Sequence, residues 1–136
     1  MIDTNILVFY LREQDRLSRD VMALLTDYES RLYISMETLK ELVTAYRRKN
    51  LFADRWRTAS EMVSGIMSTM EITVCTVDLN VVSKMALLDI NEAEDHYDPS
   101  DHVIIAHAMT LGMPLISSDR KFLYYRKQGL DLIYNE

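Results

Sequence analysis

The chain has 136 residues, 49% of them hydrophobic, with only three glycines and two prolines. This length and composition are typical of one ordered domain, residues 1–136, and exclude a linker or a disordered tail. The net charge of −6 is uneven, because residues 1–57 carry ten Lys or Arg against nine Asp or Glu, whereas residues 58–136 carry five against twelve. A uniformly basic nucleic-acid binder is therefore excluded, although a local basic patch is not.

Cys75 is the single cysteine. One thiol can build neither a disulfide framework nor a thiolate zinc site, so we expect a reducing, cytoplasmic environment. The sequence shows no signal peptide and no apolar run long enough to cross a membrane, so no membrane association is expected.

Apolar residues recur at helical spacing in several stretches, which predict helices at residues 4–13, 16–30, 36–50, 55–70, 78–90, 99–108 and 120–129. Short apolar runs between them predict strands at residues 1–3, 31–35, 72–77, 113–119 and 130–135. We expect the strand at 72–77 to be buried. Strands alternate with helices throughout, which indicates an α/β sandwich around a mostly parallel sheet.

The stretch YDPSDHVIIAHA, residues 97–108, carries two acids at the start of a helix. Asp98 is predicted to be the N-cap, with Pro99 at the first helical position. Asp101 is a first-turn acid, but Ile104 and Ile105 follow it at helical spacing, so its carboxylate leans along a face that should be buried. A buried carboxylate is costly unless a cation lies beside it.

Ligand sites in open parallel sheets lie at the carboxyl ends of the strands, and four acids fall at that edge: Asp3, Glu41, Asp101 and Asp119. Each has another explanation alone, because Asp3 and Asp119 could be helix caps and Glu41 could be solvated surface beside Glu37. Together, four carboxylates repel one another unless a divalent cation neutralises them, and oxygen ligands suit Mg²⁺ or Mn²⁺. Neutral oxygens that could help to orient them come from Thr4, Asn5, Ser117 and Ser118.

The histidines do not support a zinc site. His96, His102 and His107 never stand three or four residues apart, and no thiol pair exists. We expect His102 and His107 to be exposed or hydrogen-bonded helix residues rather than a catalytic base. No glycine-rich phosphate loop is present, so nucleotide binding has no support.

Four segments stand out together: DTNILV at 3–8, ISMETLKEL at 34–42, DPSDHVIIAHAMTLGMPLISSDRKF at 98–122 and GLDLIYN at 129–135. In this order they resemble the PIN-domain family, and within it the VapC-like toxins of bacterial toxin–antitoxin pairs. The resemblance implies a three-layer sandwich with a central sheet of four or five strands and a metal site formed by the four acids. It also implies an Mg²⁺- or Mn²⁺-dependent endoribonuclease, often a homodimer, held inactive by a cognate antitoxin.

The sequence departs from the family pattern at several positions. Ser117 stands where Thr is frequent, and Asp98 matches a less critical acid before the proline. Only two residues precede Asp3, where family members usually have several more, so either the first strand is curtailed or the native start lies upstream. His102 replaces a common Arg, which we expect to alter substrate or partner contacts rather than to remove the metal.

A carboxylate-held metal favours hydrolysis of a phosphodiester, because it activates water without a histidine base, and the resemblance implies that the phosphodiester belongs to RNA. Single-stranded or loop RNA is the favoured substrate, since its backbone can enter a narrow acidic cleft. An anionic substrate also needs flanking cations. The candidates, which are otherwise solvated helix ends, are Arg47, Arg48, Lys49, Arg55, Arg57, Arg120 and Lys121.

Two other functions remain as alternatives. A doubly wound phosphoacceptor signalling domain also gathers acids around Mg²⁺, but it would need a paired acid beside Asp3 and a Lys after a late strand. A catalytically weak PIN-fold interaction module is the other alternative, and the presence of all four acids argues against it.

Some helices carry more apolar residues than one stripe needs, including Val8, Leu11, Met22 and Met85. Such surplus surface predicts a two-fold homodimer, unless neighbouring helices of the same chain cover it. In the dimer we expect an amphipathic antitoxin segment to present an Arg or Lys to the carboxylates.

Overall fold

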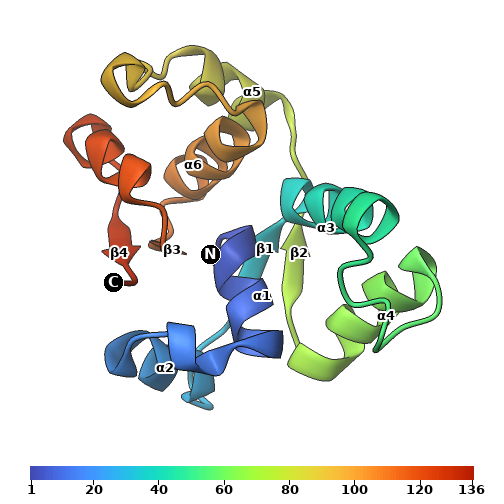
Figure 1. The fold of residues 1–136 in the computed structure, drawn as a ribbon. Coiled ribbons are helices and arrows are strands. Elements are labelled where there is room, and N and C mark those ends of the chain that lie inside the picture. Colours follow the sequence, from blue (N-terminus) through green and yellow to red (C-terminus); the bar gives the residue numbers. More distant parts are fainter.

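Parallel strands run through the centre of this computed structural model, which describes the backbone of residues 1–136 and all side chains but that of Met70. β1 (Tyr33–Ser35) pairs with β2 (Thr73–Cys75), and β3 (Leu115–Ser117) pairs with β4 (Leu132–Tyr134), both in parallel. In Figure 1 the strands form a row from β4 through β3 and the N-terminal segment to β1 and β2.

The N-terminal residues join the two strand pairs. The N–H of Ile2 donates to the carbonyl of Tyr33 over 2.9 Å, and the N–H of Ile116 donates to the carbonyl of Met1 over 2.9 Å. The pairing of Ile2 with Ile116 is a single parallel bridge, so the first strand is short. The predicted α/β fold with a mostly parallel sheet is confirmed, and its order is β2, β1, N-terminal segment, β3, β4.

The helices follow the predicted order. They are α1 (Thr4–Arg12), α2 (Arg19–Thr26), α3 (Met36–Lys49), α4 (Ala59–Met70), α5 (Leu79–Ala86) and α6 (Pro99–Leu111), with 3₁₀ helices η1 (Gln14–Arg16), η2 (Glu92–Glu94) and η3 (Arg120–Gln128). α5 and α6 lie on one side of the strands, and α1 and α2 lie on the other (Figure 1). The molecule is therefore a three-layer sandwich.

Helix boundaries follow their caps rather than the apolar pattern alone. α4 begins at Ala59, later than predicted, because the Thr58 hydroxyl accepts from the N–H of Glu61 over 3.0 Å. α6 begins as predicted, since Asp98 accepts from the N–H of Ser100 over 3.0 Å ahead of Pro99.

The predicted burial of residues 72–77 is wrong in part. β2 is an edge strand, and its residue Thr73 is exposed while Val74 and Cys75 are half-buried. An edge strand packs fewer neighbours than a central one, which is why an apolar run here does not mean full burial.

Most of the apolar residues named as surplus belong to the core instead. Val8, Leu11 and Met22 pack against the large cluster around Ile6, Leu7 and Leu42, and Met85 is half-buried. The exposed apolar side chains lie elsewhere, mainly Leu79, Val82 and Leu87 on and just after α5, together with Tyr28. Among the described residues, none of the helices combines the length and apolarity that a membrane span requires.

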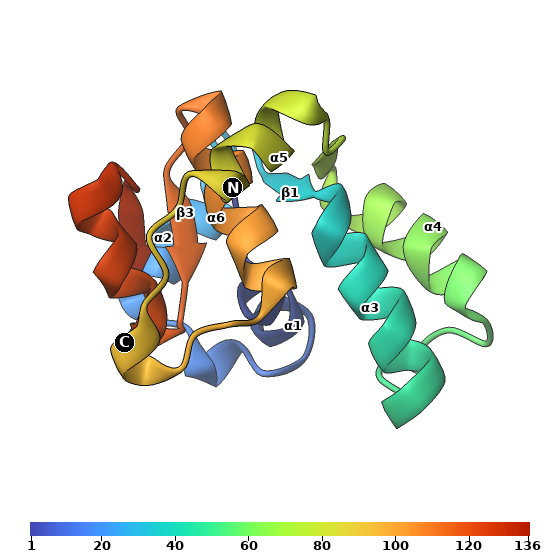
Figure 2. The same ribbon diagram turned by 90° about the horizontal axis from the view of Figure 1, so that it is seen from above.

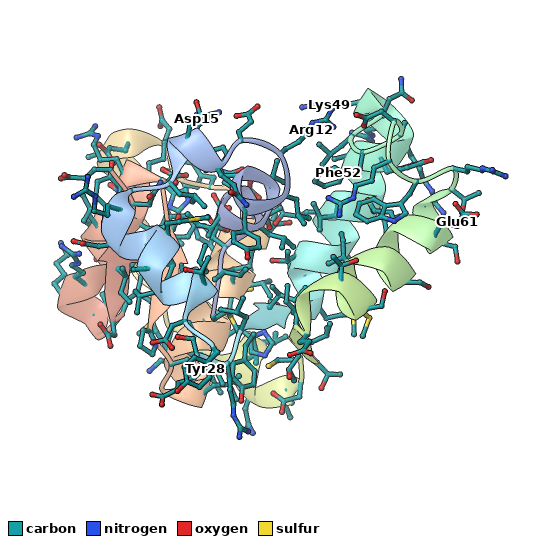
Figure 3. The ribbon with its side chains drawn as sticks, turned by 90° about the horizontal axis from the view of Figure 1, so that it is seen from below. Arg12, Asp15, Tyr28, Lys49, Phe52 and Glu61 are labelled. Carbon is teal, nitrogen blue, oxygen red and sulfur yellow. The ribbon has the colours of Figure 1, made fainter. Side chains whose placement is uncertain are left out.

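α3 and α6 are neighbours (Figure 2), and α3 begins directly after the carboxyl end of β1. The hydroxyl of Ser100 donates to Oε1 of Glu37 over 2.8 Å and so joins the first turns of the two helices. Figure 3 shows Lys49 at the far end of α3, near Arg12 and Phe52, with Tyr28 at the opposite end of the molecule. The guanidinium of Arg12 lies 5.6 Å from the ring centroid of Phe52, so α1 also contacts the segment that follows α3.

Candidate metal centre

Asp3 ends the N-terminal strand and caps α1, with only 3% of its surface exposed. Its Oδ1 accepts from the N–H of Thr4 over 2.8 Å, and its Oδ2 accepts from the Ser117 hydroxyl over 2.7 Å. The pKa of Asp3 is raised to about 7, chiefly by burial and to a smaller extent by the nearby carboxylates of Asp101 and Glu41, and these two hydrogen bonds act against the increase. Asp3 therefore caps α1 as one explanation expected, but its buried carboxyl also lies near the acids Asp101 and Glu41.

Glu41 is half-buried on α3, so it is not simply solvated surface. The hydroxyl of Thr4 donates to its Oε1 over 2.6 Å. Burial raises the pKa of Glu41, with further repulsion from Asp98 and Glu37. Thr4 therefore bridges two acids, because its N–H binds Asp3 and its hydroxyl binds Glu41.

Asp101 is the centre of the arrangement. Its carboxylate groups with those of Glu41 and Asp98, and also with Asp119 and the imidazole of His96, the ligand atoms of each group lying within 4.8 Å of one another. The pKa of Asp101 is raised to about 7, chiefly by burial and then by repulsion from Asp98, Glu41 and Asp119. The predicted convergence is therefore found for Glu41, Asp101 and Asp119, in two overlapping groups that share Asp101, whereas Asp3 belongs to neither group.

Asp119 follows β3 and caps η3, where its Oδ1 accepts from the N–H of Lys121 over 2.9 Å. Its own N–H donates to the Ser117 hydroxyl oxygen over 3.1 Å. Ser117 is fully buried and thus links Asp3 to Asp119, which is the supporting role expected for it. The half-buried Lys121 partly offsets the repulsion among the acids, since its positive charge lowers the pKa of Asp101.

This donor set fits a hard divalent cation. Carboxylates that repel one another enough to hold protons near neutrality are stabilised when a cation replaces those protons. Oxygen ligands in a partly buried pocket suit Mg²⁺ or Mn²⁺. Glu41 and Asp119 each lie close enough to Asp101 to share the cation with it, Asp98 lies at the exposed rim, and Asp3 stays a predicted ligand.

The sequence did not single out His96, which is buried with 2% of its surface exposed. Its Nε2 lies 2.9 Å from Oδ2 of Asp101, and its Nδ1 lies 3.0 Å from the hydroxyl of Tyr125. Burial lowers the pKa of His96, which favours the neutral form of the ring. The one signal for it is the requirement that a buried Asp101 should have a partner nearby.

The other two histidines are hydrogen-bonded and buried. Nε2 of His102 lies 2.8 Å from the carbonyl oxygen of His96, and Nδ1 of His107 lies 2.8 Å from the hydroxyl of Ser35. The expectation that His102 alters substrate or partner contacts is not supported, because its side chain holds the His96 segment from inside the protein.

A cleft of about 520 Å³ leads away from the acids along α3. Glu41 and Asp98 line one part of it, and Lys40, Arg48 and Lys49 line it as well. The cleft thus combines two acids of the group around Asp101 with basic side chains, and a phosphate backbone needs such cations to approach acids.

Other candidate residues lie outside this arrangement. Asn5 is exposed, and Ser118 accepts a hydrogen bond from Asn135 over 2.9 Å. Arg120 is exposed and forms an ion pair with Glu94. The guanidinium of Arg55 lies 4.7 Å from the Trp56 ring centroid, whereas Arg47 and Arg57 are exposed.

Comparison with known proteins identifies the family. The family model described as PIN domain matches residues 1–128, and the chain belongs to the PIN-domain family. No curated protein sequence matches the chain.

Solved structures share this fold at low identity. VapBC2 from Rickettsia felis, bound to a DNA fragment from its promoter, is 17% identical with a TM-score of 0.73, covering 100% of this chain and 98% of that one. DNA-bound VapBC from Salmonella typhimurium is 19% identical with a TM-score of 0.71, covering 98% and 96%. VapBC-1 from nontypeable Haemophilus influenzae is 20% identical with a TM-score of 0.65, covering 98% and 96%.

Proposed function

We propose that this chain is an Mg²⁺- or Mn²⁺-dependent endoribonuclease with one nuclease domain over residues 1–136. The observation that carries the proposal is the position of Asp101 in two overlapping acidic groups, in a chain of the PIN-domain family. The raised pKa values of Asp3 and Asp101, both about 7, support it, because buried acids of this kind gather at functional sites.

A bound divalent cation supplies water activation and polarisation of a phosphodiester. The protein contributes the fixed positions of the carboxylates. Thr4 holds Asp3 and Glu41 together, and Ser117 holds Asp3 against the end of β3. The histidine rings are already hydrogen-bonded within the protein, so the proposed chemistry assigns activation of water to the cation rather than to a histidine base.

The cleft along α3 is the proposed path of the RNA backbone. Lys40, Arg48 and Lys49 line it together with Glu41, so a phosphate that contacts these cations lies near the acids. The half-buried Lys121 offers a further cation beside Asp101. Arg47 is exposed on the same helix and belongs to the proposal, whereas the ion-paired Arg120 has the weaker case.

Cleavage of a labelled single-stranded RNA by metal-free protein tests the enzyme assignment. Addition of Mg²⁺ or Mn²⁺ should start cleavage, and Asp101→Asn should reduce the rate by about a hundredfold or more, because removal of a charge-stabilising group typically costs this much. Asp131→Asn, at an exposed acid, should cut like wild type. Metal-independent cleavage by both variants would reject the assignment, and absence of any cleavage would favour the interaction-module alternative.

We further propose that the chain is the toxin of a toxin–antitoxin pair in the cytoplasm, with a cognate antitoxin as partner. The structural likeness to VapBC complexes supports this proposal. Expression without the partner should arrest growth, and Asp101→Asn should restore it. Unimpaired growth at high levels of protein that cleaves RNA in vitro would reject the toxin role alone.

A homodimer is the proposed assembly, and α5 is its best-supported interface. Leu79 and Leu87 are each 79% exposed, and Val82 lies between them in the sequence at 49%. Exposed apolar residues that cluster in this way are typical of interfaces. Light scattering should therefore give twice the monomer mass of 15.9 kDa, and a monomer at all concentrations would reject the dimer.

A further inference from the structure

The segment between η2 and α6 places His96 against the acidic centre in a fixed orientation. Its ring packs near the rings of His102, Phe122 and Tyr125, with centroid distances of 5.0, 5.6 and 5.5 Å. With 2% of its surface exposed, it has no room to turn toward solvent. The position of the ring is therefore set by the core.

The hydrogen bonds around the ring determine which nitrogen carries the proton. A carbonyl only accepts, so Nε2 of His102, at 2.8 Å from the His96 carbonyl oxygen, must be protonated. That nitrogen therefore cannot accept from the Tyr125 hydroxyl 3.4 Å away. The hydroxyl itself accepts from the N–H of Asn91 over 3.3 Å, and its proton goes to Nδ1 of His96 over 3.0 Å.

This order places the remaining ring proton on Nε2 of His96. Nε2–H then donates to Oδ2 of Asp101 over 2.9 Å. Among the described residues, Oδ1 of Asp101 receives no hydrogen bond. The protein therefore binds one carboxylate oxygen, Oδ2, and leaves Oδ1 available to a cation. A neutral N–H donor orients the carboxylate without bringing a positive charge that would compete with a cation.

We propose that His96, held by Tyr125 and by the backbone contact of His102, is a positioning residue that fixes the carboxylate of Asp101 for the divalent cation. The proposal rests on the proposed metal-dependent function. Donors behind a ligating carboxylate typically change metal affinity by about ten- to a hundredfold when they are removed.

His96 acts through Asp101 and not as a ligand, although its imidazole lies within 4.8 Å of the Asp101 and Asp119 oxygens. Both ring nitrogens are already engaged, since Nε2 donates its proton to Asp101 and Nδ1 accepts from Tyr125. A direct bond to the cation would require breaking one of these contacts.

The test compares two amide side chains at position 96. The amide nitrogen of Gln can take the place of Nε2 of the ring, and that of Asn can take the place of Nδ1. Calorimetric titration with Mn²⁺ should give His96→Gln an affinity within about threefold of wild type, because the Gln amide reaches the position of Nε2. His96→Asn is too short to reach Asp101 and should bind Mn²⁺ about ten- to a hundredfold more weakly. His107→Asn alters another buried histidine, bonded to Ser35, and should bind like wild type.

Spectroscopy gives a second readout that does not depend on activity. Long-range proton–nitrogen NMR of the metal-free protein should show the His96 proton on Nε2, and pulsed EPR of the Mn²⁺ complex should show no directly bonded nitrogen. Wild-type affinity in His96→Asn, or a bonded His96 nitrogen, would overturn the positioning role while leaving the nuclease proposal intact.

Two further outcomes complete the test. If His96→Asn does not fold, Tyr125→Phe replaces it and should shift the NMR signals of the His96 ring and weaken Mn²⁺ binding. Unchanged signals together with unchanged affinity would overturn the proposal. A folded wild-type chain that binds no Mn²⁺ would overturn both this role and the proposed function.

Discussion

The hydroxyl of Ser117 donates to Oδ2 of Asp3 over 2.7 Å, joining residues 114 positions apart in the chain. Ser117 ends β3 and Asp3 ends the N-terminal segment beside it, and both are buried. Because neighbouring parallel strands end at the same edge, one hydroxyl can hold the first acid of the chain while its oxygen also accepts from Asp119. Ser117 therefore holds Asp3 and Asp119 in position at the buried side of the candidate centre.

Removal of the Ser117 hydroxyl should weaken metal binding more than it weakens the fold. Ser117→Ala leaves the buried Asp3 with one donor fewer, which raises its pKa further and makes the proton compete better with a cation. We expect a loss of Mn²⁺ affinity of about tenfold or more at pH 7. Ser117→Thr keeps the hydroxyl and should retain most of the affinity.

Calorimetry on the two Ser117 variants checks this prediction, with thermal unfolding of the metal-free proteins as a control for the fold. Equal Mn²⁺ affinity in the Ala and Thr variants would show that the hydroxyl has no effect on the centre.

The metal-free protein should lose stability as the pH rises, relative to Asp101→Asn. The pKa of Asp101 is about 7 in the folded state, against an ordinary value of 3.8. Between these values the folded chain holds a proton that the unfolded chain has released, so the free energy of unfolding falls with rising pH. The slope for one fully linked proton is about 1.4 kcal/mol per pH unit.

Urea unfolding of wild type and Asp101→Asn at pH 5, 6, 7 and 8 measures this effect. The stability of wild type minus that of the variant should decrease across this range, and saturating Mn²⁺ should oppose the decrease because the cation replaces the proton. A difference that does not change with pH would contradict a raised pKa at Asp101.

Basic residues along α3 should control RNA binding rather than the chemical step. Arg48 and Lys49 line the cleft together with Glu41. Replacing both by Ala should raise KM several-fold with little change in kcat, and should make KM less dependent on salt because fewer phosphate contacts remain.

Lys127→Ala is a matched control for the basic residues, since Lys127 is exposed and lies 3.9 Å from the Tyr124 ring centroid, outside the cleft. Measurement of KM and kcat for the control and the double variant at several salt concentrations checks this prediction. An equal effect of the control and the double variant would assign the change to net charge rather than to a path for RNA.

The alternation of strands and helices and the gathering of Glu41, Asp101 and Asp119 could be predicted because both depend on local rules. Helical and strand spacing place each element, and parallel strands bring their carboxyl ends together. The cap at Asp98 was predictable for the same reason, since it accepts from the N–H of Ser100 two residues later.

The features that sequence patterns missed depend on contacts between distant residues. His96 lies outside regular structure, and its partner Tyr125 is 29 residues away, so no spacing rule connects them. The surplus assigned to Val8 and Leu11 is partly covered, because other parts of the chain pack against these faces of α1. Layer packing of this kind appears only when the whole chain is folded.

Diffraction from crystals soaked in Mn²⁺ tests the central claim most directly, because anomalous scattering locates the ion without reference to activity. We predict a peak about 2.1 Å from a carboxylate oxygen of Asp101, with Asp3, Glu41 or Asp119 completing the ligands, and no such peak in Asp101→Asn. An ordered centre with no peak at Asp101, or a peak that persists in the variant, would contradict the assignment of these acids as a metal site.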